Sequence, residues 1–140
     1  MTPPRPRALV FDLDGTLVDS RRDIAEAANA TRVAFGRAPL PDERILAMVG
    51  DGARALVARV FDLPVDDPGV DEPLSRFRGI YEADPCRHAT LLPGARESLA
   101  IGLPAALVTN KPRAITSLLL EGLGIAGAFG AVWGGDDGPL

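Results

Sequence analysis

Several residue types that often supply chemistry occur only once in this chain. Among its 140 residues there is one cysteine, Cys86, one histidine, His88, and one lysine, Lys111. A single cysteine excludes an internal disulfide and is typical of a reducing compartment, so we expect a cytoplasmic protein. His88 has no nucleophile or metal ligand at a recognisable spacing, and we interpret it as a loop residue.

Long apolar runs and an excess of positive charge are also missing. No apolar run approaches the roughly 20 residues that a membrane-spanning helix needs. The basic N-terminal segment leads into an apolar run that is too short for a secretory signal. The net charge is −4, so we expect neither a nucleic acid nor a membrane as a partner. A length of 140 residues favours one domain, or a small domain that carries an insertion.

The clearest pattern is an apolar run that ends in two aspartates. Residues 8–11, Ala-Leu-Val-Phe, are typical of a strand buried on both faces of a parallel sheet. Asp12 follows at the carboxyl end of that strand, where open α/β sheets bind their ligands. Because side chains alternate along an extended segment, we expect Asp12 and Asp14 to point the same way. Gly15 then allows the backbone to turn sharply.

Two neighbouring carboxylates indicate a cation site. Clustered negative charges need a cation or a shared proton. Mg²⁺ is usually held by one or two carboxylates together with phosphate oxygens and water, so Asp12 and Asp14 predict a site for magnesium and phosphate. On its own, Asp-x-Asp-Gly fits a polar turn equally well, because aspartate and glycine both favour turns.

The segment from Ser20 to Ala83 has a helical pattern throughout. Ser20 to Asp23 has the form of a capping box, and apolar residues recur at helical spacing in four stretches, at about residues 20–35, 42–49, 56–61 and 73–83. We interpret this segment as a helical insertion. Its turn Gly50-Asp51-Gly52, with Arg54, is a candidate to reach over the site, although an ordinary interhelix turn with a solvated arginine explains it too.

Strand signals return in the last third of the chain. Residues 104–108 form a second short apolar run, which Thr109, Asn110 and Lys111 follow. Their hydroxyl, amide and ammonium groups are able to hold phosphate oxygens, although an ordinary polar strand end explains them as well. We place helices at residues 95–101 and 113–121 and a third strand at 131–133. Residues 122–127 match the pattern Gly-x-Gly-x-x-Gly. Because this motif follows a helix and not a strand, we interpret it as a helix end and not as a dinucleotide fingerprint.

Two of these motifs carry a resemblance to a known family. Phe-Asp-Leu-Asp-Gly-Thr-Leu-Val-Asp-Ser at 11–20 closely resembles the first motif of the haloacid dehalogenase-like (HAD) phosphohydrolases, and Thr-Asn-Lys-Pro at 109–112 resembles their second. Both look like the versions found in the phosphoglycolate phosphatase branch. The resemblance implies an α/β fold, with a HAD-like Rossmannoid parallel sheet core at residues 1–15 and 89–140 and an inserted α-helical cap at 16–88.

The resemblance also implies a reaction and the roles of the site residues. Asp12 would be the nucleophile that forms an aspartyl-phosphate, and Asp14 would be the general acid and base. Thr109, Asn110 and Lys111 would bind the phosphoryl group. Mg²⁺ would be held by Asp12 and Asp14, in the second case through the backbone carbonyl by analogy with the family.

The helical cap would close over a small phosphorylated metabolite, with Arg54 as a candidate contact. 2-Phosphoglycolate, hydrolysed to glycolate and phosphate, is the substrate that the motif versions indicate. Two alternatives stay open. One is another capped HAD enzyme, such as a pyrophosphatase or a sugar-phosphate mutase. The other is a catalytically incomplete fragment that binds phosphate without turnover.

The chain departs from the family pattern after residue 133. The family places a third-motif lysine or arginine, and a fourth motif with acidic metal ligands, on segments that follow the third strand, and such segments are missing here. Asp136 and Asp137 resemble the loop that precedes the third-motif lysine in the family. Because that lysine is missing here, Lys111 is the candidate to supply part of its charge. With about three strands and two helices the core is incomplete. We expect a truncated chain that either self-associates through its uncovered core or forms part of a longer protein.

Overall fold

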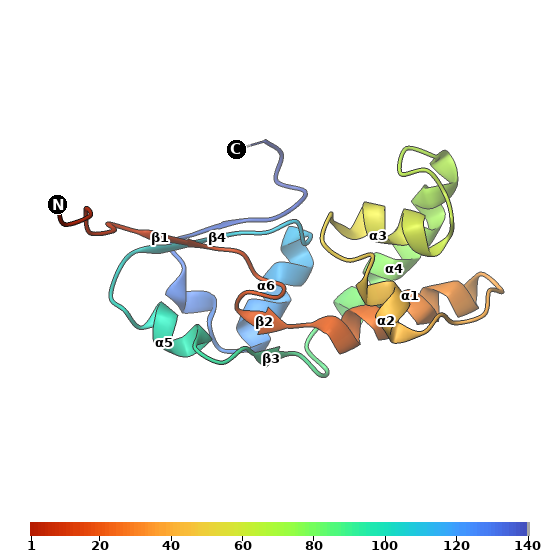
Figure 1. Cartoon of the computed structure of the whole chain (residues 1–140). Coiled ribbons are helices and arrows are strands. Elements are labelled where there is room, and N and C mark those ends of the chain that lie inside the picture. Colours follow the sequence, from red (N-terminus) through yellow and green to blue (C-terminus); the bar gives the residue numbers. More distant parts are fainter. Residues whose placement is uncertain (140) are drawn as a thin grey trace.

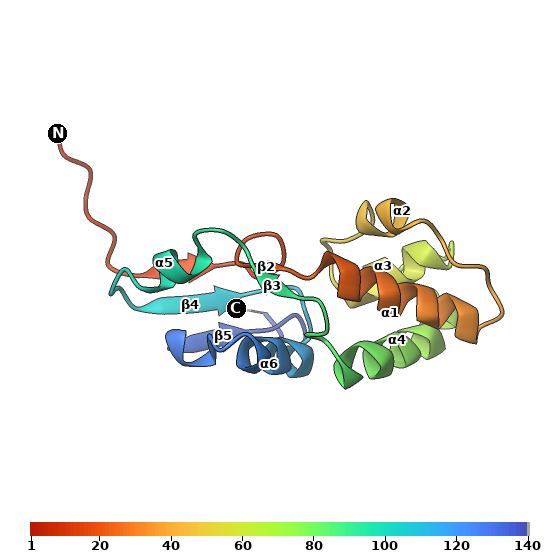
Figure 2. The ribbon, with the colours of Figure 1, turned by 90° about the horizontal axis from the view of Figure 1, so that it is seen from below.

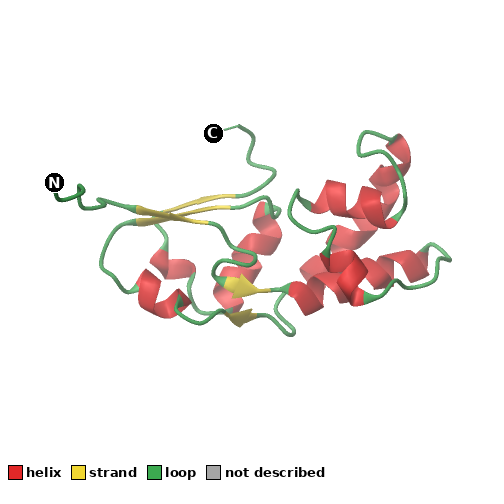
Figure 3. Ribbon diagram, viewed as in Figure 1, coloured by secondary structure: helices red, strands yellow, loops and turns green. Residues whose placement is uncertain are grey.

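The computed structural model describes residues 1–139, and its elements fall into two lobes (Figures 1 and 3). One lobe holds a parallel sheet with two helices, and the other, called the cap below, holds the helices α1 to α4. The chain enters the cap after β2 and returns to the sheet lobe before β3. In order, the elements are β1 (Leu9–Phe11), β2 (Val18–Asp19), α1 (Arg21–Ala34), α2 (Asp42–Leu46), α3 (Ala53–Val60), the 3₁₀ helix η1 (Pro68–Val70), α4 (Asp71–Ala83), β3 (Thr90–Leu91), α5 (Ala95–Leu99), β4 (Ala105–Val108), α6 (Arg113–Gly122), the 3₁₀ helix η2 (Ala126–Ala128) and β5 (Ala131–Trp133).

The larger sheet is parallel and has β4 in its centre. Its strand order is β1-β4-β5, with Phe11 paired to Leu107 and Leu107 paired to Val132. The helices α5 and α6 lie on the same face of this sheet in both views (Figures 1 and 2). Because the strands are parallel, their carboxyl ends meet at one edge, which faces the cap.

The expectation that the first strand is buried on both faces is wrong. Val10 in β1 is 70 % exposed, because within residues 1–139 the helices of the sheet lobe cover only one face (Figure 2). On the covered face, Leu107 is fully buried. An unbroken apolar run of this length does not distinguish a strand covered on both sides from one with a bare face.

Each lobe has its own hydrophobic core. The cap cluster is built by α1 to α4 and η1, with Ile115 of α6 packed into it. The sheet-lobe cluster contains Leu13 and Leu107, together with Leu17 and Val18. The division of the chain at residues 16 and 88 stays a prediction, and the packing of Leu17 and Val18 indicates that the insertion begins after β2.

A short antiparallel ribbon, which the sequence pattern did not indicate, joins the lobes. β2 pairs with β3, so the outgoing and returning segments lie side by side. Asp23 of α1 strengthens this junction, since its carboxylate accepts hydrogen bonds from the backbone N–H groups of His88, at 3.0 Å, and Ala89, at 2.9 Å. His88 is a loop residue, as expected, and its Nε2 lies 3.2 Å from a carboxylate oxygen of Glu26.

The predicted capping box at the start of α1 is wrong. Ser20 occupies the N-cap position but makes no side-chain cap hydrogen bond. Its hydroxyl instead donates to Asp14, while Asp23 is engaged at the returning segment. Both side chains that would have formed the box therefore connect α1 to the sheet lobe.

The remaining helices agree with the sequence pattern, apart from their ends. α2 ends at Leu46 and α5 at Leu99, earlier than expected. The glycine-rich stretch after α6 forms the end of that helix and η2, which confirms its interpretation as a helix end. No helix found in residues 1–139 is both long enough and apolar enough to cross a membrane.

Candidate active site

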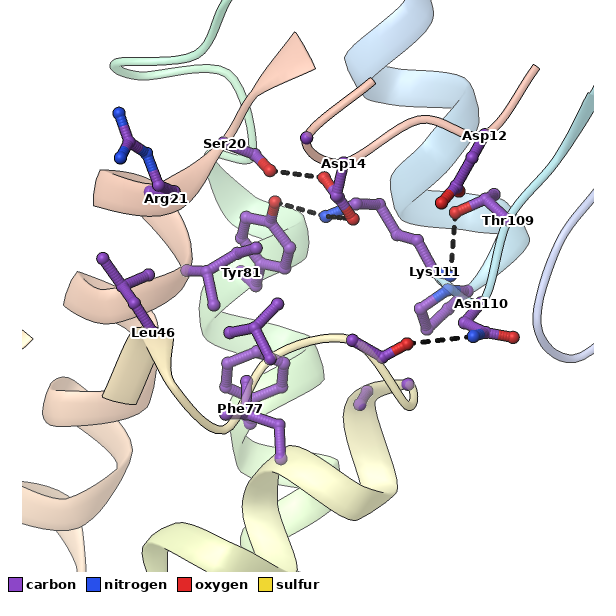
Figure 4. Close-up of a pocket in the computed structure, with 18 residues that line it drawn as sticks. Asp12, Asp14, Ser20, Arg21, Leu46, Phe77, Tyr81, Thr109, Asn110 and Lys111 are labelled. Carbon is purple, nitrogen blue, oxygen red and sulfur yellow. Dashed lines mark hydrogen bonds and ion pairs between the residues drawn. The ribbon is translucent and has the colours of Figure 1, made fainter. Parts of the chain in front are cut away.

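A pocket of about 270 Å³ lies between the carboxyl edge of the parallel sheet and the cap (Figure 4). Its sheet side contains every site residue predicted in that lobe, and its cap side is largely apolar. The sheet lobe contributes Asp12, Asp14, Thr109, Asn110 and Lys111, and the apolar wall includes Ile24, Leu46, Leu56 and Phe77.

Neighbouring parallel strands bring Asp12 and Thr109 together. Asp12 follows β1 directly, and Thr109 follows β4, its partner strand. The backbone N–H of Thr109 donates to the carbonyl of Trp133 at 2.9 Å, which fixes the threonine at the sheet edge, where it faces Asp12 (Figure 4). The Asp12 carboxylate is exposed at this edge and accepts a hydrogen bond from the N–H of Leu13 at 2.7 Å. An exposed carboxylate beside a hydroxyl is suited to meet a phosphoryl group.

A tight turn after β1 positions Asp14. Gly15 has a φ of +77°, a conformation that glycine adopts without strain. The carbonyl of the fully buried Leu13 accepts hydrogen bonds from the N–H groups of Leu17 and Val18, at 3.0 and 3.1 Å. As a result Asp14 lines the same pocket as Asp12 (Figure 4), which confirms the expectation that the two carboxylates face the same way.

The Asp14 carboxylate has a partner at each oxygen. Ser20 Oγ donates to Oδ1, and Lys111 Nζ lies 3.3 Å from Oδ2. Lys111 is only 6 % exposed; burial lowers the pKa of its ammonium, and the charge of Asp14 opposes that shift. The same Nζ donates a hydrogen bond to the hydroxyl of Tyr81 in α4 at 2.6 Å. Lys111 is therefore present at the predicted site, but its charge is paired with Asp14.

The turn between α2 and α3 reaches the pocket, so the structure favours the interpretation that this turn reaches over the site and not that it is an ordinary interhelix turn. Asn110 Nδ2 donates to the carbonyl of Gly50 at 3.0 Å. Gly52 has a φ of +93°, and a Cβ atom there would lie 3.5 Å from the carbonyl oxygen of Asn110. Both glycines line the pocket. Asn110 therefore ties the cap to the sheet edge with one of its amide hydrogens, and its other polar groups are available to a ligand.

Arg54 does not line the pocket, so its prediction as a cap contact to the substrate is wrong for this structure. Its guanidinium donates to the carbonyls of Val65 and Asp67, at 2.6 and 3.1 Å, and pairs with Asp71 at 2.7 Å. These bonds hold the side chain against the segment around η1. The physical reason is local, because three acceptors surround the guanidinium on its own side of the cap.

Three polar or charged cap residues at the pocket are not found from the sequence: Ser20, Arg21 and Tyr81. The sequence pattern places Ser20 in a capping box and Tyr81 within the helix expected at residues 73–83, without a role at the site. Arg21 lies at the pocket wall and is held by Asp19 through two side-chain bonds of 2.9 and 2.8 Å. Tyr81 and its partner Lys111 are 30 residues apart in the sequence. Helical periodicity does not show such a pairing, because it depends on how the cap sits against the sheet.

The donor chemistry of the pocket fits magnesium. Asp12 and Asp14 present carboxylate oxygens, and Thr109 and Asn110 add a hydroxyl and an amide oxygen on the same side of the pocket. Such hard oxygen donors, completed by phosphate oxygens and water, are those that Mg²⁺ prefers. Two carboxylates alone would leave most of the coordination to ligand and solvent.

A second group of potential metal ligands lies at the junction of the lobes. One ligand atom each of Asp23, Glu26 and His88 lies within 4.8 Å of the others. However, both oxygens of Asp23 accept backbone hydrogen bonds from the returning segment. This cluster is explained by its role in joining α1 to that segment, and it lies outside the pocket.

The aspartates after β5 brace the sheet edge. Asp136 accepts a hydrogen bond from the backbone N–H of Arg113 at 2.8 Å, and Asp137 pairs with the Arg113 guanidinium at 2.7 Å. A Cβ atom at Gly135 would lie 2.1 Å from the carbonyl oxygen of Asn110, so only glycine allows this close approach. Neither aspartate lines the pocket, and both lie in the loop that follows β5.

A parallel sheet whose first strand ends in paired aspartates, interrupted by a helical cap, defines a class of hydrolase. The family model described as haloacid dehalogenase-like hydrolase matches residues 6–139, and the chain belongs to this family.

Comparison with individual proteins narrows the similarity to one branch. The chain is 40 % identical over 142 residues to a phosphoglycolate phosphatase of Rhodospirillum rubrum, covering 94 % of this chain and 59 % of that protein. It is also 40 % identical over 141 residues to a phosphoglycolate phosphatase of Chromobacterium violaceum, covering 95 % and 64 %. A crystal structure of a predicted phosphoglycolate phosphatase from Haemophilus somnus superposes with a TM-score of 0.81 at 26 % identity, over 96 % of this chain and 64 % of that one. The chain thus spans about three-fifths of the length of the relatives it matches.

Proposed function

We propose that the protein is a Mg²⁺-dependent phosphatase that hydrolyses a small phosphate monoester through an aspartyl-phosphate. This proposal rests on one observation. Asp12, Asp14 and Thr109 lie together at one sheet edge, in a pocket whose other wall is the cap. The family to which the chain belongs and the printed names of its relatives support the same reaction class.

In the first step, an Asp12 carboxylate oxygen attacks phosphorus and the bond to the leaving oxygen breaks. Asp14 donates a proton to that oxygen, so the alcohol leaves neutral. In the second step, Asp14 accepts a proton from a water molecule as the water oxygen attacks phosphorus, and the bond to Asp12 breaks to release phosphate. Thr109 and Asn110 donate hydrogen bonds to the phosphoryl oxygens.

Charge balance is the main demand on this site. A phosphate monoester carries roughly −1.5 to −2 near neutral pH, and Asp12 adds another negative charge. Mg²⁺, when held by Asp12 and Asp14, supplies positive charge that allows the two anions to approach. Closure of the cap over a bound substrate would exclude water and so strengthen these interactions.

The substrate that we propose is 2-phosphoglycolate. The names of the relatives point to it, and a pocket of about 270 Å³ suits a small molecule. The localisation that we propose is cytoplasmic, on the evidence of the single cysteine.

A second candidate function is phosphate binding without turnover. It is favoured by one specific observation: the chain's only lysine is paired with Asp14 at 3.3 Å and so does not directly balance the charge on Asp12.

The test is phosphate release from 2-phosphoglycolate by the 140-residue chain, with Mg²⁺ and with a chelator. We expect release that requires Mg²⁺ and falls about a thousandfold or more in Asp12→Asn. Asp66→Asn, a change at an exposed aspartate outside the pocket, is the matched control and should leave the rate unchanged. Heat on titration with inorganic phosphate, combined with no release above the Asp12→Asn background, would instead support binding without turnover.

A further inference from the structure

Tyr81 is a buried polar residue to which the proposed reaction assigns no role. It is the only tyrosine of the chain, it belongs to α4 of the cap, and it is 3 % exposed. Burial raises the pKa of its phenol above the ordinary value, so the hydroxyl stays neutral. That hydroxyl lies in the pocket beside Lys111, the only lysine (Figure 4).

The Lys111 ammonium is held between the two lobes. On the cap side, Nζ donates to the Tyr81 hydroxyl at 2.6 Å and lies 4.4 Å from the centre of the tyrosine ring. On the sheet side, it lies 3.3 Å from Oδ2 of Asp14. A buried ammonium needs acceptors for its three donors, and in the part of the chain that the structure describes these are the two side-chain acceptors in contact with it. One cap hydroxyl therefore helps to set where this charge lies.

We propose that Tyr81 is a positioning residue that holds the Lys111 ammonium against Asp14. In this way the position of the cap is coupled to the acid–base chemistry of Asp14. This inference rests on the proposed function, because the role of Asp14 comes from it. With the ammonium at Oδ2 and Ser20 at Oδ1, the Asp14 carboxylate is fixed at both oxygens. Without the tyrosine hydroxyl, the ammonium is free to move toward Asp12 or a bound phosphoryl group, and Asp14 loses its orientation.

Removing only the hydroxyl tests the role in catalysis. We expect Tyr81→Phe to lower kcat for 2-phosphoglycolate by about ten- to a hundredfold. A loss of this size is typical when a residue that orients the reacting groups is removed or displaced. KM should change by less than about twofold, because Tyr81 does not bind substrate in this proposal. Thr31→Val is the matched control: it also removes a buried cap hydroxyl, but one that bonds only the carbonyl of Ala27, at 2.8 Å, so its kinetics should match the wild type.

A double-mutant cycle shows whether Tyr81 acts through Lys111. In a Lys111→Met background the further change Tyr81→Phe should cost nothing more, because the contact is already gone. Independent losses that multiply in the double variant would overturn the proposal.

Because Lys111 is the only lysine and Tyr81 the only tyrosine, the contact between them can be followed without measuring activity. Protein labelled with ε-¹⁵N-lysine gives a single side-chain ammonium signal, which belongs to Lys111. In the wild type we expect this signal to be shifted from that of free lysine and slow to exchange with water. Tyr81→Phe should move the signal and speed its exchange, whereas Thr31→Val should leave both unchanged.

The two measurements separate this inference from the proposed function. An unmoved lysine signal in Tyr81→Phe overturns the inference, whether or not the chain hydrolyses phosphate esters. A moved signal with unchanged kcat also overturns it, since the contact would then not serve the reaction. A moved signal in a chain that shows no phosphate release in any variant supports the contact between the lobes and contradicts the proposed function.

Discussion

The two lobes of this protein differ in the site residues they contribute and in the size of their buried cores. The cap cluster has fifteen buried residues, fourteen from the cap and Ile115 from α6, whereas the sheet-lobe cluster has eight. Yet the sheet lobe carries Asp12, Asp14 and Thr109, the groups assigned to the reaction, and it leaves Val10 bare on one face. The groups assigned to the reaction therefore lie on the lobe with the smaller buried core.

Because the sheet lobe has the smaller core, the contacts that join the lobes help to hold the site residues in place. The sheet edge is held by its strand pairing and by three contacts with the cap. Ser20 Oγ donates to Asp14, Lys111 Nζ donates to the Tyr81 hydroxyl, and Asn110 Nδ2 donates to the backbone carbonyl of Gly50. A sheet lobe with a small core gains rigidity from such contacts, because they restrict groups that its own packing does not.

The largest stability effect should come from the small core. Leu107 lies at the centre of β4 and is fully buried, so Leu107→Ala should lower the free energy of unfolding by about 3 kcal/mol, measured by urea unfolding. Because β4 aligns Asp12 with Thr109, phosphate binding should weaken as well. Ile45→Ala in the cap, also fully buried, should cost a similar free energy but leave phosphate affinity unchanged. Equal loss of affinity in both variants would contradict a division of roles between the lobes.

The sequence was sufficient to predict the α-helices, the three parallel strands and the sheet-side residues of the site. Short apolar runs that end in polar residues located β1 and β4, and parallel pairing then requires that Asp12 and Thr109 lie at the same edge. The residues that sequence reasoning misplaced are held by contacts with other elements of the fold. Arg54 turned to acceptors around η1, and Asp23 bonds a segment 65 residues away. Local periodicity contains no information on such pairings.

A second effect of intermediate size concerns the junction of the lobes. Asp23 is 4 % exposed, and Asp23→Ala would leave the N–H groups of His88 and Ala89 without their acceptor. We expect a loss of about 2 kcal/mol in the free energy of unfolding and faster hydrogen exchange at these two amides, measured by NMR. Asp71→Ala is the control, because it removes a carboxylate from an exposed ion pair with Arg54 inside the cap and should cost less than about 1 kcal/mol. Unaltered exchange at both amides in Asp23→Ala would show that the ribbon alone holds the junction.

A smaller effect is expected on the bare face of the sheet. Val10 is 70 % exposed, so Val10→Thr should change the free energy of unfolding by less than about 0.5 kcal/mol, in contrast to Leu107→Ala on the covered face. If the bare face mediates the self-association that we expect from the sequence, the same variant should sediment with a smaller average mass at high concentration. A large destabilisation with no change in association would mean that this face is covered within the monomer.

The smallest effect should appear as a pH dependence at the end of the sheet lobe. The Gly134 N–H and the Arg113 guanidinium hold the pKa of the Asp137 carboxyl below its usual range. The unfolded chain therefore takes up a proton at a higher pH than the folded one. The stabilisation from this carboxylate is present above the ordinary value of about 3.9 and is lost as the pH falls through the lowered folded value.

Unfolding midpoints between neutral and strongly acidic pH test this sign. We expect Asp137→Asn to lower the stability slightly at neutral pH and to make its loss in acid shallower than in the wild type, since one carboxylate that must be protonated is gone. Asp66→Asn removes an exposed aspartate outside this network and should keep the wild-type slope. An acid limb as steep in Asp137→Asn as in the control would show that the contact with Arg113 is too open to solvent to stabilise β5. The sheet edge would then depend on strand pairing and the cap alone.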